Sequence, residues 1–210
     1  MDLYDEDWVA RWLSRPLCCK YVAVVFRTVS IPNEVVQARP RTFIRWGLGY
    51  LTGGESEILG AWKTLDPALD VPHPVFAELH ERGVESFQVL ASRDAAEEVS
   101  VLLRDVPGSG DCGEHIITLQ GRSLSESEAM RSLRPATRRA VLAADEVVEG
   151  INRRLKSALA RRGAFLGDAE AMVFVADFLA RADRRLYEPP QRRRGVVRSR
   201  AAPAGAALPA

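Results

Sequence analysis

The chain has 210 residues, of which 47% are hydrophobic and 27% are charged, and its net charge is +1. This composition suffices for one globular domain with a core, or for two small domains, and it excludes a disordered protein. No apolar run approaches the ~18 residues of a membrane span, and the N-terminus is acidic, so we expect a cytoplasmic protein without a span or a secretory signal.

The first part of the chain is predicted to form a helix followed by an antiparallel meander. Residues 5–13 place apolar side chains at helical spacing and predict a short amphipathic helix. Residues 21–29 are a nearly continuous β-branched run, typical of a central strand buried on both faces. Residues 41–51 and 56–64 flank a glycine-containing turn and predict a β-hairpin.

The middle of the chain predicts helices alternating with a strand. Residues 75–82 have helical periodicity and end at Gly83, an expected helix stop. A short apolar strand is predicted over residues 87–91, followed by a helix over residues 95–104. A helix that joins two strands favours parallel strands, so we expect a mixed sheet and an α/β fold.

The remainder of the chain is predicted to be helical and basic. Helices are expected over residues 125–131, 135–160 and 169–185, and the Pro-, Ala- and Arg-rich residues 187–210 are expected to be a disordered tail. Residues 131–210 carry 17 Lys or Arg against 8 Asp or Glu, whereas residues 1–130 carry 12 against 20. The basic part would attract a polyanion, unless its charges only solvate helix surfaces and a tail.

One helical stretch combines residue types that can carry chemistry. Glu149, Asn152 and Arg153 lie three and four residues apart and are expected to share a face. A carboxylate, an amide and a guanidinium can hold a divalent metal and a phosphate, or can be an ordinary solvated ion pair. Cys112 and His115 have the spacing of zinc ligands, but no second pair completes four ligands, so we expect no structural zinc.

Other conspicuous side chains have structural interpretations. Cys18 and Cys19 are expected to be small buried hydrophobic residues, and no disulfide framework is indicated. His73 and His80 are expected at the surface or at helix ends. The hairpin carries aromatic and aliphatic residues that either fill the core under the sheet or form an apolar face for a partner protein: Phe43, Ile44, Trp46 and Trp62.

Five segments follow one another in a recognisable order over residues 12–184. They are WLSRPL at 12–17, GYLTGGESEILGAW at 49–62, LHERGVESFQVLAS at 79–92, CGEH at 112–115 and DEVVEGINRRLKSALARRGAFLGDAEAMVFVADFLARADRR at 145–185. In these segments the sequence resembles the Mutator-type transposases of bacterial insertion sequences. Their motifs include W-x-x-R-P-L before the first strand, G-x-x-x-x-G-x-x-E-x-L-G-x-W in a hairpin, and a late helix that carries a glutamate.

The resemblance implies an RNase H-like catalytic fold, with an antiparallel meander plus a parallel strand flanked by helices. In that fold two Asp from strands and a Glu from a late helix bind two Mg²⁺ ions for phosphodiester cleavage and strand transfer. Glu149 matches the family's helix Glu. The first Asp position falls on residues 24–27, which contain no carboxylate, and Ser92 is followed by Arg93, with Asp94 one place late. By resemblance, Glu149 and Asp94 are the candidate catalytic and metal-binding residues.

The resemblance also implies a DNA partner, the ends of an insertion sequence, with a homo-oligomer or an intact transposase as further partners and no membrane. Residues 1–186 are expected to form one shortened domain without the family's long helical insertion, and catalysis is expected to be impaired. The alternative is a non-catalytic, regulatory remnant that binds DNA or a transposase. The residues expected to contact DNA are Asn152, Arg153, Arg154, Lys156, Arg161 and Arg162.

Overall fold

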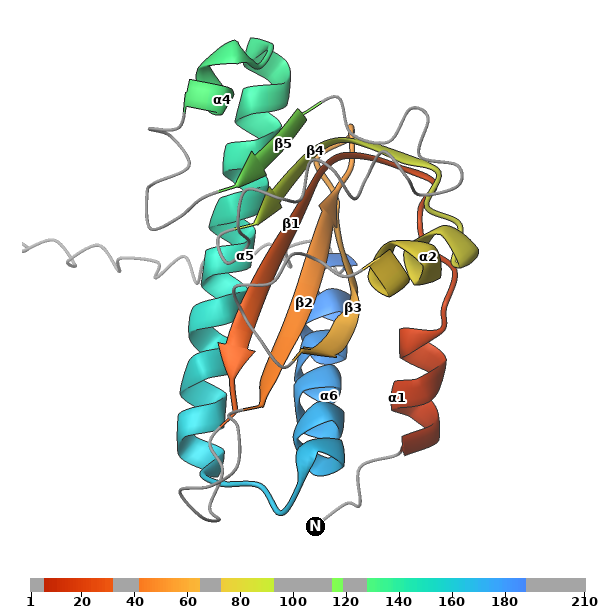
Figure 1. Ribbon diagram of the computed structural model, residues 1–210, viewed down its shortest axis with the longest axis vertical. Coiled ribbons are helices and arrows are strands. Elements are labelled where there is room, and N and C mark those ends of the chain that lie inside the picture. The colour runs from red at the N-terminus through yellow and green to blue at the C-terminus, as the bar shows by residue number, and fades with distance from the viewer. Residues whose placement is uncertain (1–5, 32–41, 65–72, 93–114, 119–127, 188–210) are drawn as a thin grey trace, which may run out of the picture.

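A mixed β-sheet forms the centre of the protein (Figure 1). The computed structural model describes residues 6–31, 42–64, 73–92, 115–118 and 128–187. Within these ranges the elements are, in chain order, α1 (Glu6–Leu13), β1 (Lys20–Ser30), β2 (Phe43–Tyr50), β3 (Ser56–Thr64), α2 (His73–Glu81), β4 (Ser86–Ser92), β5 (His115–Thr118), α4 (Glu128–Ser132), α5 (Pro135–Arg162) and α6 (Asp168–Tyr187).

The strands are arranged in the order β3-β2-β1-β4-β5. Strands β1, β2 and β3 form an antiparallel meander, whereas β4 runs parallel to β1 on its other side and β5 runs parallel to β4. The predicted mixed sheet, with a meander and a parallel strand, is confirmed. The edge strand β5 is not among the predicted elements. Strand β4 lies beside β1 rather than β3, since α2 carries the chain from one side of the sheet to the other.

Strand β1 is central because its apolar side chains are buried on both faces. Val25 belongs to the larger core cluster, whereas Val24 belongs to the smaller one on the opposite face. The neighbouring strand β2 leaves room for an aromatic ring of β1. A Cβ atom at Gly49 would lie 2.3 Å from a ring atom of Tyr21, so only a glycine fits there without displacing the ring.

Three helices, α1, α5 and α6, cover one face of the sheet, and α2 covers the other (Figure 1). Helix α5 packs on β1 and β2, α6 packs on β3, and α1 packs on α6. Apolar side chains at helical spacing, such as Val148 and Leu155 of α5, are fully buried against the sheet. The opposite surface of α5 and α6 is therefore free to carry the charged residues.

A buried carboxylate on α6 anchors the N-terminal segment. Asp183 accepts hydrogen bonds from Trp12 Nε1 at 3.1 Å, Arg15 Nη2 at 2.8 Å and the backbone N–H of Ile58 at 2.7 Å. Burial raises the pKa of Asp183, while Arg15 and the two N–H donors act in the opposite direction. The donors come from α1, from the segment after it and from β3, so Asp183 ties these parts of the fold to α6.

The hairpin aromatics belong to the core. Trp46 and Ile44 are fully buried in the larger cluster. Trp62 is half-buried and packs on the smaller cluster, with its ring centroid 5.9 Å from that of Phe26. The interpretation of these residues as core filling is confirmed for Trp46 and Ile44, whereas Phe43 and Trp62 are half-buried.

Two predictions about single residues have opposite outcomes. The prediction that both Cys18 and Cys19 are buried is wrong, because Cys18 is half-buried and Cys19 is exposed where the chain enters β1. The Nδ1 atom of His80 lies 3.2 Å from the carbonyl oxygen of Val84, just beyond α2, which agrees with the predicted position at a helix end.

Several predictions concern residues outside the described ranges. These are the helix over residues 95–104, the side chain of Cys112, and residues 188–210 of the tail. Within the described part of the chain, no helix combines the length and the apolar character that crossing a bilayer requires.

Candidate functional site

The sheet register brings together the positions that the resemblance assigns to catalysis. Phe26 near the end of β1 pairs with Ser92 at the end of β4. The next residue of β1, Arg27, contacts Glu149 of α5. The positions expected to carry carboxylates on β1 and on α5 therefore lie close together, beside the residue at which β4 ends.

At this end of the sheet a guanidinium, rather than an aspartate, faces Glu149. Arg27 Nε donates a hydrogen bond to Glu149 Oε1 at 2.9 Å, Arg27 Nη2 pairs with Asp145, and Nη1 donates to the carbonyl oxygen of Phe26 at 2.9 Å. Asp145 and Glu149 are one helical turn apart on α5, so both reach the same guanidinium. We call Arg27, Asp145 and Glu149 the Arg27 cluster.

The Arg27 cluster is held at the boundary between core and solvent. The side chain of Arg27 is 3% exposed, that of Asp145 is 13% exposed and that of Glu149 is 43% exposed. A guanidinium keeps its charge even when it is buried, so Arg27 needs the two carboxylates. The cluster therefore places a permanent positive charge where the resemblance expects a metal ligand on β1.

The described residues do not fit a Mg²⁺ ion at Glu149. Its carboxylate is paired with Arg27, and a guanidinium competes with a metal ion for the same oxygens. Within the ranges that the structure describes, no three His, Cys, Asp or Glu side chains are grouped so that they could hold a metal. Asp94, the other residue predicted to bind metal, lies outside these ranges.

Glu149, Asn152 and Arg153, which the sequence predicts on one face of α5, differ in how deeply they are buried. Asn152 is buried at 5% exposure, and its Oδ1 has no hydrogen-bond partner among the described residues, whereas Arg153 is exposed. The prediction that Asn152 contacts DNA therefore does not fit its burial, since a phosphate cannot reach a side chain that is shielded from solvent.

The other residues predicted to contact DNA lie on the outer surface of α5. Among them, Arg162 is held by Glu170 at 2.5 Å and lies over the ring of Phe165. Arg154 Nε donates to the Gly150 carbonyl oxygen at 3.2 Å. The exposed set is Arg153, Arg154, Lys156, Arg161 and Arg162.

Part of this basic surface is hollowed into a groove between α5 and α6. The α5–α6 groove encloses about 490 Å³. Arg181 and Arg185 of α6 line this groove, and the sequence does not predict them. Their spacing of four residues places them on one face of the helix. Only the packed structure shows that this face lies beside α5. The full lining is Arg153, Arg154, Ser157 and Arg161 of α5 with Phe178, Arg181, Ala182 and Arg185 of α6.

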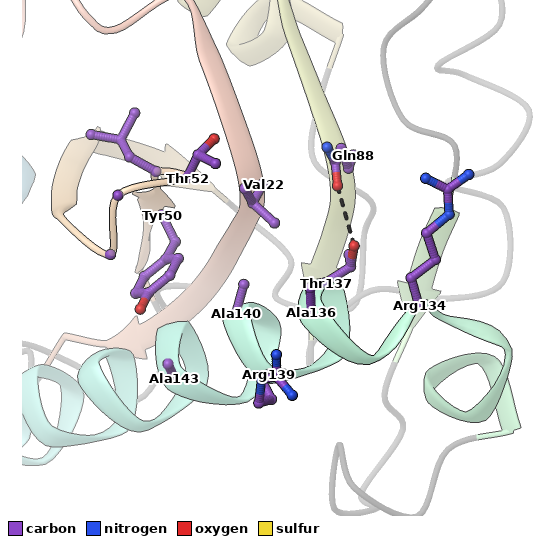
Figure 2. A pocket seen from close by; sticks show the side chains of 13 residues that line it. Val22, Tyr50, Thr52, Gln88, Arg134, Ala136, Thr137, Arg139, Ala140 and Ala143 are labelled. Atoms are coloured by element: carbon purple, nitrogen blue, oxygen red, sulfur yellow. Dashed lines mark hydrogen bonds between the residues drawn. The ribbon is translucent and has the colours of Figure 1, made fainter.

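A second hollow, of about 520 Å³, lies at the beginning of α5 (Figure 2). Its walls are the first turns of α5, the β2–β3 turn, and residues of β1 and β4. Thr137 Oγ1 donates to Gln88 Oε1 at 3.3 Å, and small side chains such as Ala140 and Ala143 line the helix side. This hollow and the α5–α6 groove are at different ends of α5.

No known protein family matches the chain, and no curated protein matches it in sequence. Its function is therefore inferred from the arrangement of its own residues.

Proposed function

We propose that the chain is a transposase-like protein of the Mutator type, with an RNase H-like fold, that binds DNA without cleaving it. The observation that carries the proposal is the contact between Arg27 and Glu149. The glutamate of α5 lies beside β1, as the resemblance implies, but the β1 residue that it contacts is a cation instead of an aspartate.

The sheet supports the fold assignment. An antiparallel meander is followed by strands parallel to β1, and helices cover both faces. Phe26 of β1 pairs with Ser92, the last residue of β4, and Glu149 of α5 contacts the residue after Phe26. This is the placement that the resemblance implies for the catalytic residues.

The charges at this place support loss of cleavage. Two-metal phosphodiester cleavage needs carboxylates that are free to bind cations. Here the Glu149 carboxylate accepts a hydrogen bond from Arg27, and the same guanidinium pairs with Asp145. Replacing a negative ligand by a positive side chain removes a ligand and adds electrostatic repulsion against Mg²⁺. Cleavage is therefore the part of the family's activity that this chain lacks.

The outer surface of α5 supports DNA binding. Its exposed arginines and Lys156 provide the charge that phosphate contacts need, and such contacts give affinity that depends on salt and little on sequence. We expect the logarithm of the duplex-binding constant to fall linearly with the logarithm of the salt concentration.

A mobility-shift titration at several salt concentrations tests this proposal. The variant Arg154→Gln with Arg161→Gln is compared with Arg11→Gln on the exposed face of α1. Each phosphate contact contributes about 0.9 to the slope of the logarithm of the binding constant against the logarithm of the salt concentration, here called the salt slope. The salt slope of the double variant is therefore expected to be smaller by roughly two, and that of the control is expected to be unchanged. Affinity that does not change with salt, or equal slopes in all proteins, would contradict the proposal.

A further inference from the structure

The α5–α6 groove has positive charge on both of its walls. Arg153, Arg154 and Arg161 approach it from α5, and Arg181 and Arg185 approach it from α6. No carboxylate is among its lining residues. Within the described part of the chain, Arg153, Arg161 and Arg185 form no ion pair, so their charges remain available.

One of the α6 arginines is held in place. Arg181 forms a two-point contact with Asp177, with 3.1 Å from Nε to Oδ1 and 2.8 Å from Nη2 to Oδ2. A guanidinium has five N–H donors, so Arg181 keeps donors for a ligand. Held at one side, it loses less conformational freedom when an anion binds.

The groove also has an apolar part. The side chains of Phe178 and Ala182 line it between the arginines, and Phe178 is only half-buried. Phosphates alone need no such surface. An aromatic ring beside guanidinium groups is the combination on which unpaired bases stack while their phosphates are neutralised.

We propose that the α5–α6 groove binds single-stranded DNA, with the phosphodiester backbone on the arginines of both helices and a base against Phe178. The proposal rests on the proposed DNA-binding function and adds Arg181, Arg185 and Phe178 to it. A volume of about 490 Å³ is that of a pocket for a small ligand, which suits a short piece of one strand. In a duplex the bases are stacked on one another, so the ring of Phe178 has no base to contact.

Fluorescence anisotropy with the full chain tests this inference. A labelled 20-nucleotide oligo(dT) probe and a labelled 20-base-pair duplex are titrated separately. The wild type is expected to bind the single strand more tightly. The pair Arg181→Gln with Arg185→Gln is expected to lose about tenfold in single-strand affinity and about 1.4 in salt slope, since each phosphate contact to a single strand contributes about 0.7.

Two further variants separate the roles of charge and ring. The pair Arg131→Gln with Arg138→Gln removes the same charge from exposed positions outside the groove. It is expected to change single-strand affinity much less. Phe178→Leu keeps an apolar side chain and removes the ring, and it is expected to weaken single-strand binding severalfold while leaving duplex binding unchanged.

The outcomes distinguish this inference from the proposed function. If the wild type prefers the duplex, or if the two arginine pairs lose equal affinity, the groove is not a single-strand site, although general DNA binding stands. If Phe178→Leu affects both probes equally, the stacking contact is contradicted. If the wild type binds neither probe, the proposed function itself fails.

Discussion

Arg27 and Glu149 are 122 positions apart in the sequence, and a hydrogen bond of 2.9 Å between Arg27 Nε and Glu149 Oε1 joins them. The contact fixes α5 against the central strand near one end of the sheet. Because Arg27 is almost fully buried and Glu149 is not, the two residues contribute differently to stability. Removing the cation takes the Arg27 guanidinium away from both carboxylates, whereas removing one carboxylate leaves the other in place beside Arg27.

Neutralising Arg27 is therefore expected to destabilise the protein more than neutralising Glu149. Arg27→Met should lower the free energy of unfolding by about 2–3 kcal/mol, since a nearly buried carboxylate loses its counter-ion. Glu149→Gln should lower it by less than about 1 kcal/mol, because 43% of the side chain is exposed and Asp145 still pairs with Arg27. Urea unfolding measures both values. Lys63→Met, which breaks a pair with Asp168 in which the two side chains are 48% and 42% exposed, is the control, and an effect as large as that of Arg27→Met would contradict this assignment.

The buried carboxylate of Asp183 is expected to be essential for anchoring the N-terminal segment. Asp183→Ala removes the acceptor of Trp12 Nε1 and of the Ile58 backbone N–H and the carboxylate that pairs with Arg15, and it should lower the free energy of unfolding by about 3 kcal/mol. Because α1 packs on α6, proteolysis near residue 15 should also become faster. Asp7→Ala, on the exposed side of α1, serves as the control. Equal stability of the two variants would show that the anchor is unimportant.

The two glycines Gly49 and Gly150 are expected to respond to alanine in opposite directions. A Cβ at Gly49 would lie 2.3 Å from the Tyr21 ring, so Gly49→Ala must displace a buried side chain and should cost about 2 kcal/mol. Apart from the backbone of α5 and the residues adjacent to Gly150, no atom of the described structure lies within 4 Å of a Cβ at this position, so Gly150→Ala should gain up to about 1 kcal/mol from helix propensity. Thermal unfolding compares the two, and a stable Gly49→Ala protein would contradict the close packing of β1 on β2.

Tyr21 is expected to make stability dependent on alkaline pH. Burial raises the pKa of Tyr21 well above its ordinary value, and its hydrogen bond to Glu57, at 2.5 Å, acts in the same direction. The folded protein therefore keeps a proton that the unfolded chain releases near pH 10. Because the folded state then binds more protons, this contribution is complete below about pH 10 and decreases as the pH rises further.

Guanidinium unfolding between pH 8 and pH 11 measures the effect of Tyr21. Tyr21→Phe should begin about 1 kcal/mol less stable at pH 8, since a hydrogen bond to Glu57 is lost, but its stability should fall less steeply above about pH 10. Parallel curves for the two proteins would mean that Tyr21 ionises normally.

The sequence predicts the elements whose signal is local. The β-branched run of β1, the hairpin glycines and the apolar spacing of α5 and α6 each lie within a few turns of chain, and the structure confirms them. Strand β5 is only four residues long and exists through its pairing with β4, which no local pattern shows. Helix pattern alone likewise placed Asn152 on the wrong side of the core boundary.

The candidate site is less predictable because it depends on which elements meet. A charged residue within an apolar strand indicates that Arg27 needs a partner, but only the packing of α5 on β1 identifies Asp145 and Glu149. The arginines of α6 become part of a groove only because α5 lies alongside. The periodicity of apolar residues predicts which face of a helix is buried, but it does not predict which other element that face packs against.

Incubation of supercoiled plasmid with the full chain in EDTA, Mg²⁺ or Mn²⁺ tests the central claim most directly, when bound and nicked DNA are resolved on the same gels. We predict that the protein shifts the plasmid in all three conditions and leaves it supercoiled in each. Nicking that needs Mg²⁺ or Mn²⁺ and disappears in Glu149→Gln would contradict the claim that the Arg27 cluster has replaced the metal site.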